Sequence, residues 1–300
     1  MGGETMKGLV SINGEIVGAH KAHISVFDRG FLFGDSVYEV THTYGRRIFL
    51  WKERWERMQH SARCIGISLP WDEGRFLAET LRVLKALDVE DAYIRWVVTR
   101  GEGEIGLDPS LGGRGNVVIF VRPFEGNPSW WYGKGVSLLI SGVQRNAVDA
   151  LDPNIKSGNY LNNMMAFKEA LEKGFFDAIM LNAQGAVTEG TTFNVWVVQG
   201  ETILTPPPES GLLLGIIRQK LGALIREGEA FELREQSLRP EDIFKARECF
   251  ITSSSKELVP VTAVDGHKIG DGRPGPVYQK LHTQFQKWRD RRLKEDDLAY

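Results

Sequence analysis

The hydrophobic and polar positions of the chain follow two periods, one of two residues and one near 3.6 residues. Apolar runs on both sides of Asn13 and Gly14 predict a hairpin with a tight turn, because both residues tolerate positive φ. A second hairpin is predicted where residues 37–44 and 48–50 flank the turn 45–47. The N-terminal part of the chain is therefore expected to begin as antiparallel sheet.

Further along, the period lengthens and predicts amphipathic helices. Apolar residues recur at helical spacing over 51–65 and again over 76–87. Later helices are predicted at 160–173, 215–227 and 277–294. Strands are predicted at 92–99, 117–122, 136–143, 177–181, 195–198, 248–252 and 259–264. Strands and helices thus mix in both halves, which favours an α/β (α+β) protein of two domains.

A stretch rich in Pro, Gly and aromatic residues, 124–134, is the expected interdomain linker. It would separate a small N-terminal α/β domain, residues 1–123, from a large C-terminal domain, residues 135–300. The chain shows neither an internal repeat nor a low-complexity segment, so a solenoid is not expected.

Composition narrows the function classes. Lys and Arg number 37 against 39 Asp and Glu, a net charge of −2, and 42% of the residues are hydrophobic. This near-neutral globular profile argues against a protein that binds nucleic acid or membranes through bulk charge. The charged tail 289–297 is interpreted as solvated surface.

The cysteines and the N-terminus bear on the compartment. Cys64 and Cys249 are the only cysteines, without a CxxC pair, so neither a disulfide framework nor a thiolate metal site is expected. The N-terminal MGGETMKGLV lacks the pattern of a signal peptide. We expect a cytoplasmic protein without a bound metal.

Lys156 is the first residue that suggests chemistry. It lies in DPNIKSGNY, directly before a predicted helix whose opening NNMM we expect to be buried. A desolvated amine loses its proton more readily and suits Schiff-base chemistry. An ordinary surface lysine is the alternative.

Three further segments suggest a cofactor, each with a plain structural alternative. Glu189 stands in TEGTTFN before an apolar strand, where a carboxylate could face a ring nitrogen or simply belong to a turn. LLGIIR, residues 213–218, opens a helix with glycine and would expose N–H groups to an anion. The hydroxyls of TSSS, residues 252–255, suit a phosphate and equally suit any loop.

The order of these segments resembles the class IV (fold-type IV) pyridoxal-phosphate-dependent aminotransferases along nearly the whole chain. The residues that carry the resemblance are FDRGFLFGDSVYE (27–39), ERMQHSA (56–62), Lys156 with YLNN (160–163), TEG (188–190), LGI (214–216) and ELVPV (257–261). The resemblance implies a two-domain D-amino-acid-aminotransferase-like fold and pyridoxal 5'-phosphate (PLP) as the cofactor.

The family's roles carry over to matching positions. Lys156 resembles the lysine that binds the cofactor as a Schiff base and then moves a proton. Glu189 resembles the carboxylate at the pyridine nitrogen, and Arg57 the arginine that binds the phosphate. The remaining cofactor-binding residues implied by the resemblance are Tyr160, Gly215, Ile216, Ile217 and Ser254. Family members often have threonine where Ile217 stands, so one side-chain hydrogen bond is expected to be missing.

The substrate class rests on the first domain. Tyr93 and Arg95 alternate with apolar residues and would share one face of a strand. This Tyr-Ile-Arg pattern is most similar to the branched-chain aminotransferases, in which the arginine receives the distal carboxylate of 2-oxoglutarate. The implied substrate-binding residues are Phe33, Tyr38, Tyr93, Arg95 and Ser255, with Trp131 as a further aromatic wall. In the alternative, Arg95 only pairs with an acid.

Other reactions stay open. D-amino-acid aminotransferases share the DRGFLFGD segment, although no Arg-x-His pair follows Thr99-Arg100-Gly101. Aminodeoxychorismate lyases, (R)-selective amine transaminases and a non-catalytic binding protein are further alternatives. The GxGxxG at 101–106 lacks a clear helix after it and is interpreted as a mobile loop near the substrate. The resemblance also implies a homodimer, or an assembly of dimers, whose site borrows a loop from the neighbouring subunit.

Overall fold

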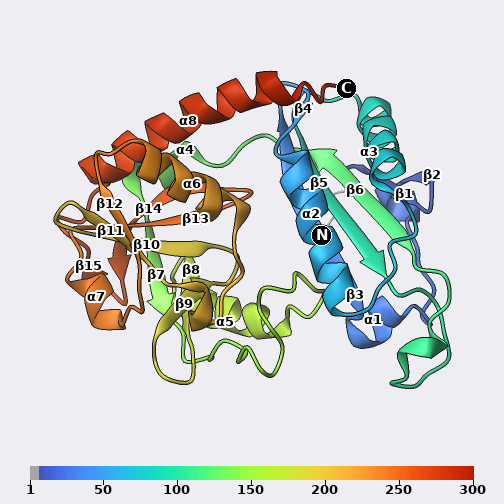
Figure 1. The fold of residues 1–300 in the computed structure, drawn as a ribbon, viewed down its shortest axis with the longest axis horizontal. Helices are drawn as coiled ribbons and strands as arrows, with labels where there is room; N and C mark the ends of the chain where they lie inside the picture. Colours follow the sequence, from blue (N-terminus) through green and yellow to red (C-terminus); the bar gives the residue numbers. More distant parts are fainter. Residues whose placement is uncertain (1–6) are drawn as a thin grey trace. The chain divides into compact units, whose positions relative to one another are not determined.

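The computed structural model describes residues 7–300, so the first six residues of the N-terminal stretch lie outside it. The chain divides into two compact units. Unit 1 runs to Glu125 and includes Ile155–Asn159 and Arg292–Tyr300; unit 2 comprises Gly126–Asn154 and Tyr160–Arg291. Each unit is built around its own sheet (Figure 1).

Unit 1 contains a six-stranded antiparallel sheet in the order β2-β1-β6-β5-β3-β4. Its strands are β1 (Leu9–Ile12), β2 (Glu15–Gly18), β3 (Ser36–Tyr44), β4 (Arg47–Ile48), β5 (Ala92–Thr99) and β6 (Val117–Pro123). Its helices are α1 (Arg29–Phe33), α2 (Trp51–Cys64) and α3 (Glu73–Leu87). Helices α2 and α3 cover one face, where Trp55, Phe76, Ile94 and Trp96 form part of the core (Figure 1). On the opposite face, Tyr93 and Arg95 of β5 are half-buried.

Unit 2 contains a nine-stranded mixed sheet in the order β12-β11-β10-β13-β14-β7-β8-β9, with β15 paired to β14. Its strands are β7 (Val136–Ile140), β8 (Asp177–Leu181), β9 (Val187–Gly190), β10 (Asn194–Gln199), β11 (Thr202–Thr205), β12 (Glu232–Glu235), β13 (Glu248–Ser253), β14 (Glu257–Val264) and β15 (His267–Lys268). Its helices are α4 (Ser129–Lys134), α5 (Leu161–Glu172), α6 (Ile216–Glu227), α7 (Pro240–Phe244) and α8 (Pro276–Asp296), whose last residues, from Arg292, belong to unit 1. The central strands are buried on both faces, which explains their continuous apolar runs.

The predicted elements are largely confirmed. Asn13 and Gly14 both have positive φ at the turn between β1 and β2. The second hairpin forms from β3 and β4, although β4 covers Arg47–Ile48 rather than the predicted 48–50. The predicted strand 136–143 is too long, because β7 ends at Ile140. The α/β class with two sheets is confirmed.

Several short elements escaped prediction. Strand β12 has the sequence ELRE and is mostly exposed, so it carries no apolar alternation. It pairs through its backbone with the equally short β11. Helices α1, α4 and α7 have five or six residues, too few to repeat a helical period.

One expectation about burial is wrong, and a second holds only in part. Met164 and Met165, at the helix opening expected to be buried, are 63% and 53% exposed on α5. The tail 289–297 is not simply solvated surface, since Leu293 is buried and Arg289 forms an ion pair with Glu257 at 2.7 Å. Amphipathic spacing indicates that a helix has an apolar and a polar face, but it does not indicate which face packs against the rest of the protein.

The stretch expected as a linker, 124–134, contains helix α4, which packs against β14. The domain ranges given by the sequence stay a prediction. Within residues 7–300, no helix is long and apolar enough to cross a membrane.

Candidate active site

Lys156 lies in a short segment that pairs with β3 in unit 1. The Tyr38 N–H donates to the Lys156 carbonyl at 3.0 Å, and the Lys156 N–H donates to Ser61 Oγ at 3.1 Å. Val37 and Ser157 form a β-bridge beside it. The backbone of Lys156 is therefore fixed by both β3 and α2, and the residue is 9% exposed.

The side chain of Lys156 reaches Tyr38. Its Nζ donates to Tyr38 Oη at 3.3 Å and lies 4.4 Å from the centre of the tyrosine ring. The guanidinium carbon of Arg95 lies 4.0 Å from the same ring centre. Tyr38 thus contacts the expected Schiff-base residue and the expected carboxylate-binding residue, both within unit 1.

Arg57 is paired with Glu39, a partner that the sequence did not reveal. The Arg57 Nε and Nη2 donate to the two Glu39 carboxylate oxygens at 2.6 and 2.9 Å. Glu39 is fully buried, and Arg54 Nη1 lies 3.9 Å from it. Burial alone would raise the pKa of Glu39, but Arg57, with Lys156 and Arg54, holds that pKa below its ordinary value. Because Glu39 occupies one edge of the Arg57 guanidinium, the arginine plane is fixed.

Glu189 lies on β9 in unit 2 and is 5% exposed. Its carboxylate accepts from Arg145 Nε at 3.0 Å and from the Leu213 N–H at 3.1 Å. Arg145 Nη1 in turn donates to Asn162 Oδ1 at 3.2 Å. The sequence analysis missed Arg145, because a single arginine in a loop belongs to no recognisable pattern. Arg145 and Glu189 are far apart in the sequence and become neighbours only when the chain folds.

The N-terminus of α6 presents backbone donors. Gly215 is the N-cap residue and makes no side-chain capping bond, so the first N–H groups of the helix are not used by a cap. A Cβ atom at position 215 would overlap the Oδ1 atom of Asn194. The Nδ2 atom of the same asparagine donates to the Leu213 carbonyl at 2.9 Å. Glycine is thus required where the chain enters the helix, and Ile216 and Ile217 are buried behind it.

Ser254 and Ser255 form the turn between β13 and β14 and are half-buried. Tyr160 is the N-cap residue of α5, likewise in unit 2. Phe33, at the end of α1, lies under the Arg29 guanidinium, whose carbon is 5.0 Å from the ring centre. Trp131 packs against Phe176 at 5.0 Å in the core of unit 2, which gives that side chain a structural role.

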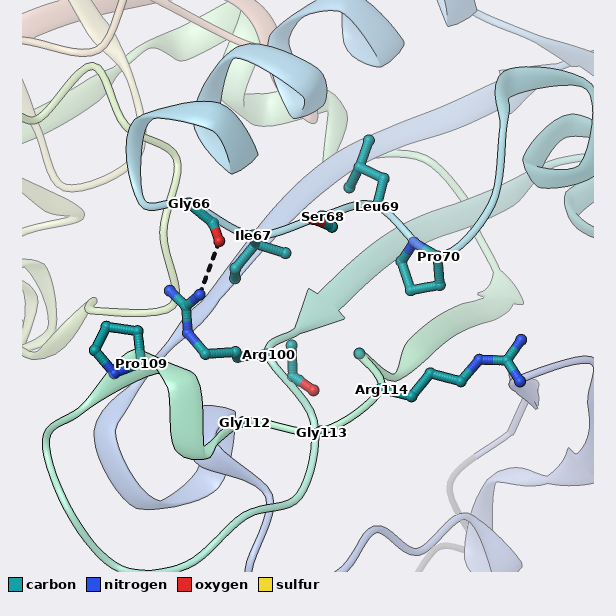
Figure 2. Close-up of a pocket in the computed structure, with 12 residues that line it drawn as sticks. Gly66, Ile67, Ser68, Leu69, Pro70, Arg100, Pro109, Gly112, Gly113 and Arg114 are labelled. Carbon is teal, nitrogen blue, oxygen red and sulfur yellow. Dashed lines mark hydrogen bonds between the residues drawn. The ribbon is translucent and has the colours of Figure 1, made fainter.

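The GxGxxG segment is folded onto its own loop. Glu102 and Gly103 form β-bridges with Asp28 and Gly112, and only a three-residue helix follows. A cavity of about 310 Å³ lies beside this loop. Figure 2 shows Arg100 among the residues that line it. Arg100 donates there to the Gly66 carbonyl at 2.8 Å and to both oxygens of Asp35. None of the expected site residues lines this cavity.

The residues fit a phosphorylated pyridine aldehyde. A buried lysine, a buried carboxylate, an arginine with a fixed plane and an uncapped helix start supply the four kinds of group that such a cofactor needs. The space left by Gly215 would be filled by any side chain. The two sheets have the architecture of the fold-type IV enzymes, a class that uses PLP.

Comparison with known proteins identifies the family. The model of the family described as amino-transferase class IV matches residues 36–264. A putative branched-chain-amino-acid aminotransferase of Methanocaldococcus jannaschii is 35% identical, covering 93% of this chain and 96% of that protein. A D-alanine aminotransferase of Bacillus licheniformis is 32% identical, covering 92% and 95%. The crystal structure of the branched-chain amino acid aminotransferase of Escherichia coli has a TM-score of 0.90 at 27% identity, covering 94% of this chain and 95% of that chain. The chain belongs to the class IV aminotransferases and is a PLP-dependent transaminase.

Proposed function

We propose that the enzyme transfers the amino group of a branched-chain, hydrophobic L-amino acid to 2-oxoglutarate. The observation that carries this proposal is the contact of Tyr38 with both Lys156 and Arg95. It brings a cation suited to a second carboxylate beside an aromatic ring suited to an apolar side chain. The branched-chain relatives support the same substrate class.

PLP is the proposed cofactor, and when bound it supplies an electrophilic carbon and a ring that accepts electrons. Lys156 binds the cofactor and moves the proton at the substrate Cα. Glu189, ion-paired with Arg145 at 3.0 Å, holds a proton on the ring nitrogen. Arg57, the N–H groups of Ile216 and Ile217 at Gly215, and Ser254 bind the phosphate, and Tyr160 binds the phenolic oxygen.

The substrate is proposed to meet Phe33, Tyr38 and Tyr93 with its apolar side chain, and Ser255 with its α-carboxylate. Arg95 receives the distal carboxylate of the 2-oxo acid. Tyr93 and Arg95 both project from the half-buried face of β5, away from the core formed by Ile94 and Trp96. This face is therefore available for a ligand.

The second candidate is D-amino-acid transamination, which the Bacillus licheniformis relative favours. An absorbance scan of the purified enzyme before and after L-leucine, with D-alanine in parallel, separates the two. Loss of the cofactor band near the visible–ultraviolet border with L-leucine only supports the proposal. Loss of the cofactor band with D-alanine only would instead support D-amino-acid transamination.

The proposal extends to a homodimer in the cytoplasm. Helix α5 packs onto β8 through the small residues Ala166 and Ala170, while its large apolar residues face outward. These are Leu161, Met164, Met165 and Leu171, each more than half exposed. Such a patch is typical of a surface that a second copy covers. The free cysteines Cys64 and Cys249 agree with a reducing compartment.

A further inference from the structure

The turn that carries Ser254 and Ser255 has an unusual backbone. β13 and β14 pair from Ser253 to Glu257, so three residues form the loop of this hairpin. Glu257 closes the loop with φ of 55°, a left-handed conformation in which such hairpins ordinarily place glycine. A glutamate at this position costs free energy, so contacts from outside the turn must offset the strain.

Two of these contacts come from the segment around α4. Asn127 Nδ2 donates to the Ser255 carbonyl at 2.7 Å and to Tyr132 Oη at 2.9 Å. Tyr132 Oη donates to the Lys256 carbonyl at 3.1 Å. Both protons of the asparagine amide and the tyrosine proton are therefore used on one network.

A third contact comes from α8. Arg289 Nη1 forms an ion pair with Glu257 Oε1 at 2.7 Å, with both side chains largely buried. The ring of Tyr132 is stacked on His282 at 5.5 Å, and His282 is stacked on Tyr278 at 5.5 Å. The Tyr132 hydroxyl thus reaches the turn from a ring that α8 holds in place.

These contacts fix the orientation of whole peptide units in the turn. A peptide unit is planar, so fixing a carbonyl also fixes the direction of the N–H in the same unit. Asn127 fixes the unit between Ser255 and Lys256, and Tyr132 fixes the unit between Lys256 and Glu257. Burial raises the pKa of Tyr132, so its hydroxyl keeps the proton that it donates.

We propose that Asn127 and Tyr132 are positioning residues that orient the turn bearing Ser254 and Ser255 toward the cofactor phosphate and the substrate carboxylate. This inference rests on the proposed function, which assigns those two serines their ligands. Asn127 and Tyr132 touch neither ligand in this scheme; they act through the Ser255 and Lys256 carbonyls.

The test compares two hydroxyl deletions in the same aromatic stack of the holoenzyme. Tyr132→Phe removes the bond to the turn, whereas Tyr278→Phe removes a buried hydroxyl that has no hydrogen-bond partner among residues 7–300. We expect Tyr132→Phe to raise KM for L-leucine about fivefold, with kcat changed less than about twofold, and to speed PLP release about fivefold. Tyr278→Phe should change none of the three.

A double-mutant cycle with Ser255→Ala excludes a merely structural role. If Tyr132 acts through the turn, Ser255→Ala and Tyr132→Phe together should raise KM little more than Ser255→Ala alone. Additive effects, or equal constants for Tyr132→Phe and Tyr278→Phe, would overturn the inference.

The same data separate the inference from the function on which it rests. If Ser255→Ala raises KM and Tyr132→Phe does not, only the inference fails. If Ser255→Ala leaves KM unchanged, the assignment of Ser255 fails, and PLP release then decides the inference through Ser254. Faster PLP release from Tyr132→Phe than from Tyr278→Phe supports the inference, and equal rates of PLP release refute it.

Discussion

At the scale of single residues, the candidate site is built from charges that the fold buries in pairs. Glu39 neutralises Arg57, and Arg145 neutralises Glu189. The sequence predicted Lys156, Glu189 and Arg57 because each stands in a motif that a family shares. It could not predict their partners, since Glu39 and Arg145 become neighbours of these residues only when distant segments meet.

The first prediction concerns Lys156. Lys156→Ala should lower kcat at least about a thousandfold, because one amine both binds the cofactor and moves the proton. Borohydride treatment followed by mass spectrometry should add the cofactor mass to the wild type and not to the variant. Lys168→Ala, on the exposed side of α5, is the control and should keep the added mass. A Lys156→Ala protein that still gains it would refute the assignment.

The second prediction concerns the buried cluster of Glu39, Arg54 and Arg57. Glu39→Gln should lower the free energy of unfolding by about 3–5 kcal/mol at neutral pH, because it leaves the buried Arg54 and the largely buried Arg57 without their carboxylate. The matched change Glu172→Gln removes an exposed ion pair with Lys168 and should cost about 0.5 kcal/mol or less. Urea unfolding measures both, and equal losses would contradict the prediction.

The same variant gives a pH test. The pKa of Glu39 is lowered in the folded protein from an ordinary 4.5, so its stabilising contribution is complete above that pH. The contribution is lost as the pH falls through the lowered folded value. Stability of the wild type should therefore fall more steeply in acid than that of Glu39→Gln, and parallel curves would argue against an ionised Glu39.

At the scale of elements, length decided what the sequence could predict. Helices α2, α3, α5, α6 and α8 each span at least twelve residues and showed their period clearly. Strand β9, which carries Glu189, has four residues and only one aliphatic side chain, so its sequence looked equally like a turn. The position of Glu189 is instead set by pairing with β8.

The third prediction tests the start of α6. Gly215→Ala should raise the dissociation constant of PLP about tenfold or more, because the new Cβ overlaps Asn194 and displaces the N–H groups proposed to bind the phosphate. Gly222→Ala on the same helix has room for a Cβ at ordinary contact distance and should leave PLP binding unchanged. Its unfolding free energy should rise by up to about 1 kcal/mol. Equal PLP affinity in both variants would refute a phosphate site at this helix start.

At the scale of the whole molecule, the unexplained feature is the outward face of α5. The periodicity of residues 160–173 predicted the helix correctly, yet the inward side consists of Asn163, Ala166 and Ala170. Small inward residues let α5 lie close to β8, and the large residues are left for another surface. Sequence patterns describe a single chain, so they could not distinguish a core from an interface with a second copy.

The fourth prediction follows from symmetry. If this face joins two copies, each substitution on it occurs twice in the dimer, and Met164→Glu places two carboxylates in an apolar contact. We expect the dimer dissociation constant to rise at least about a hundredfold, measured by light scattering over a concentration series. Ala86→Glu, at an exposed position of α3, introduces the same charge outside the face and should leave the mass unchanged. A wild type that is monomeric throughout the series, or a Met164→Glu variant with the mass of the wild type, would show that something other than a second copy covers α5.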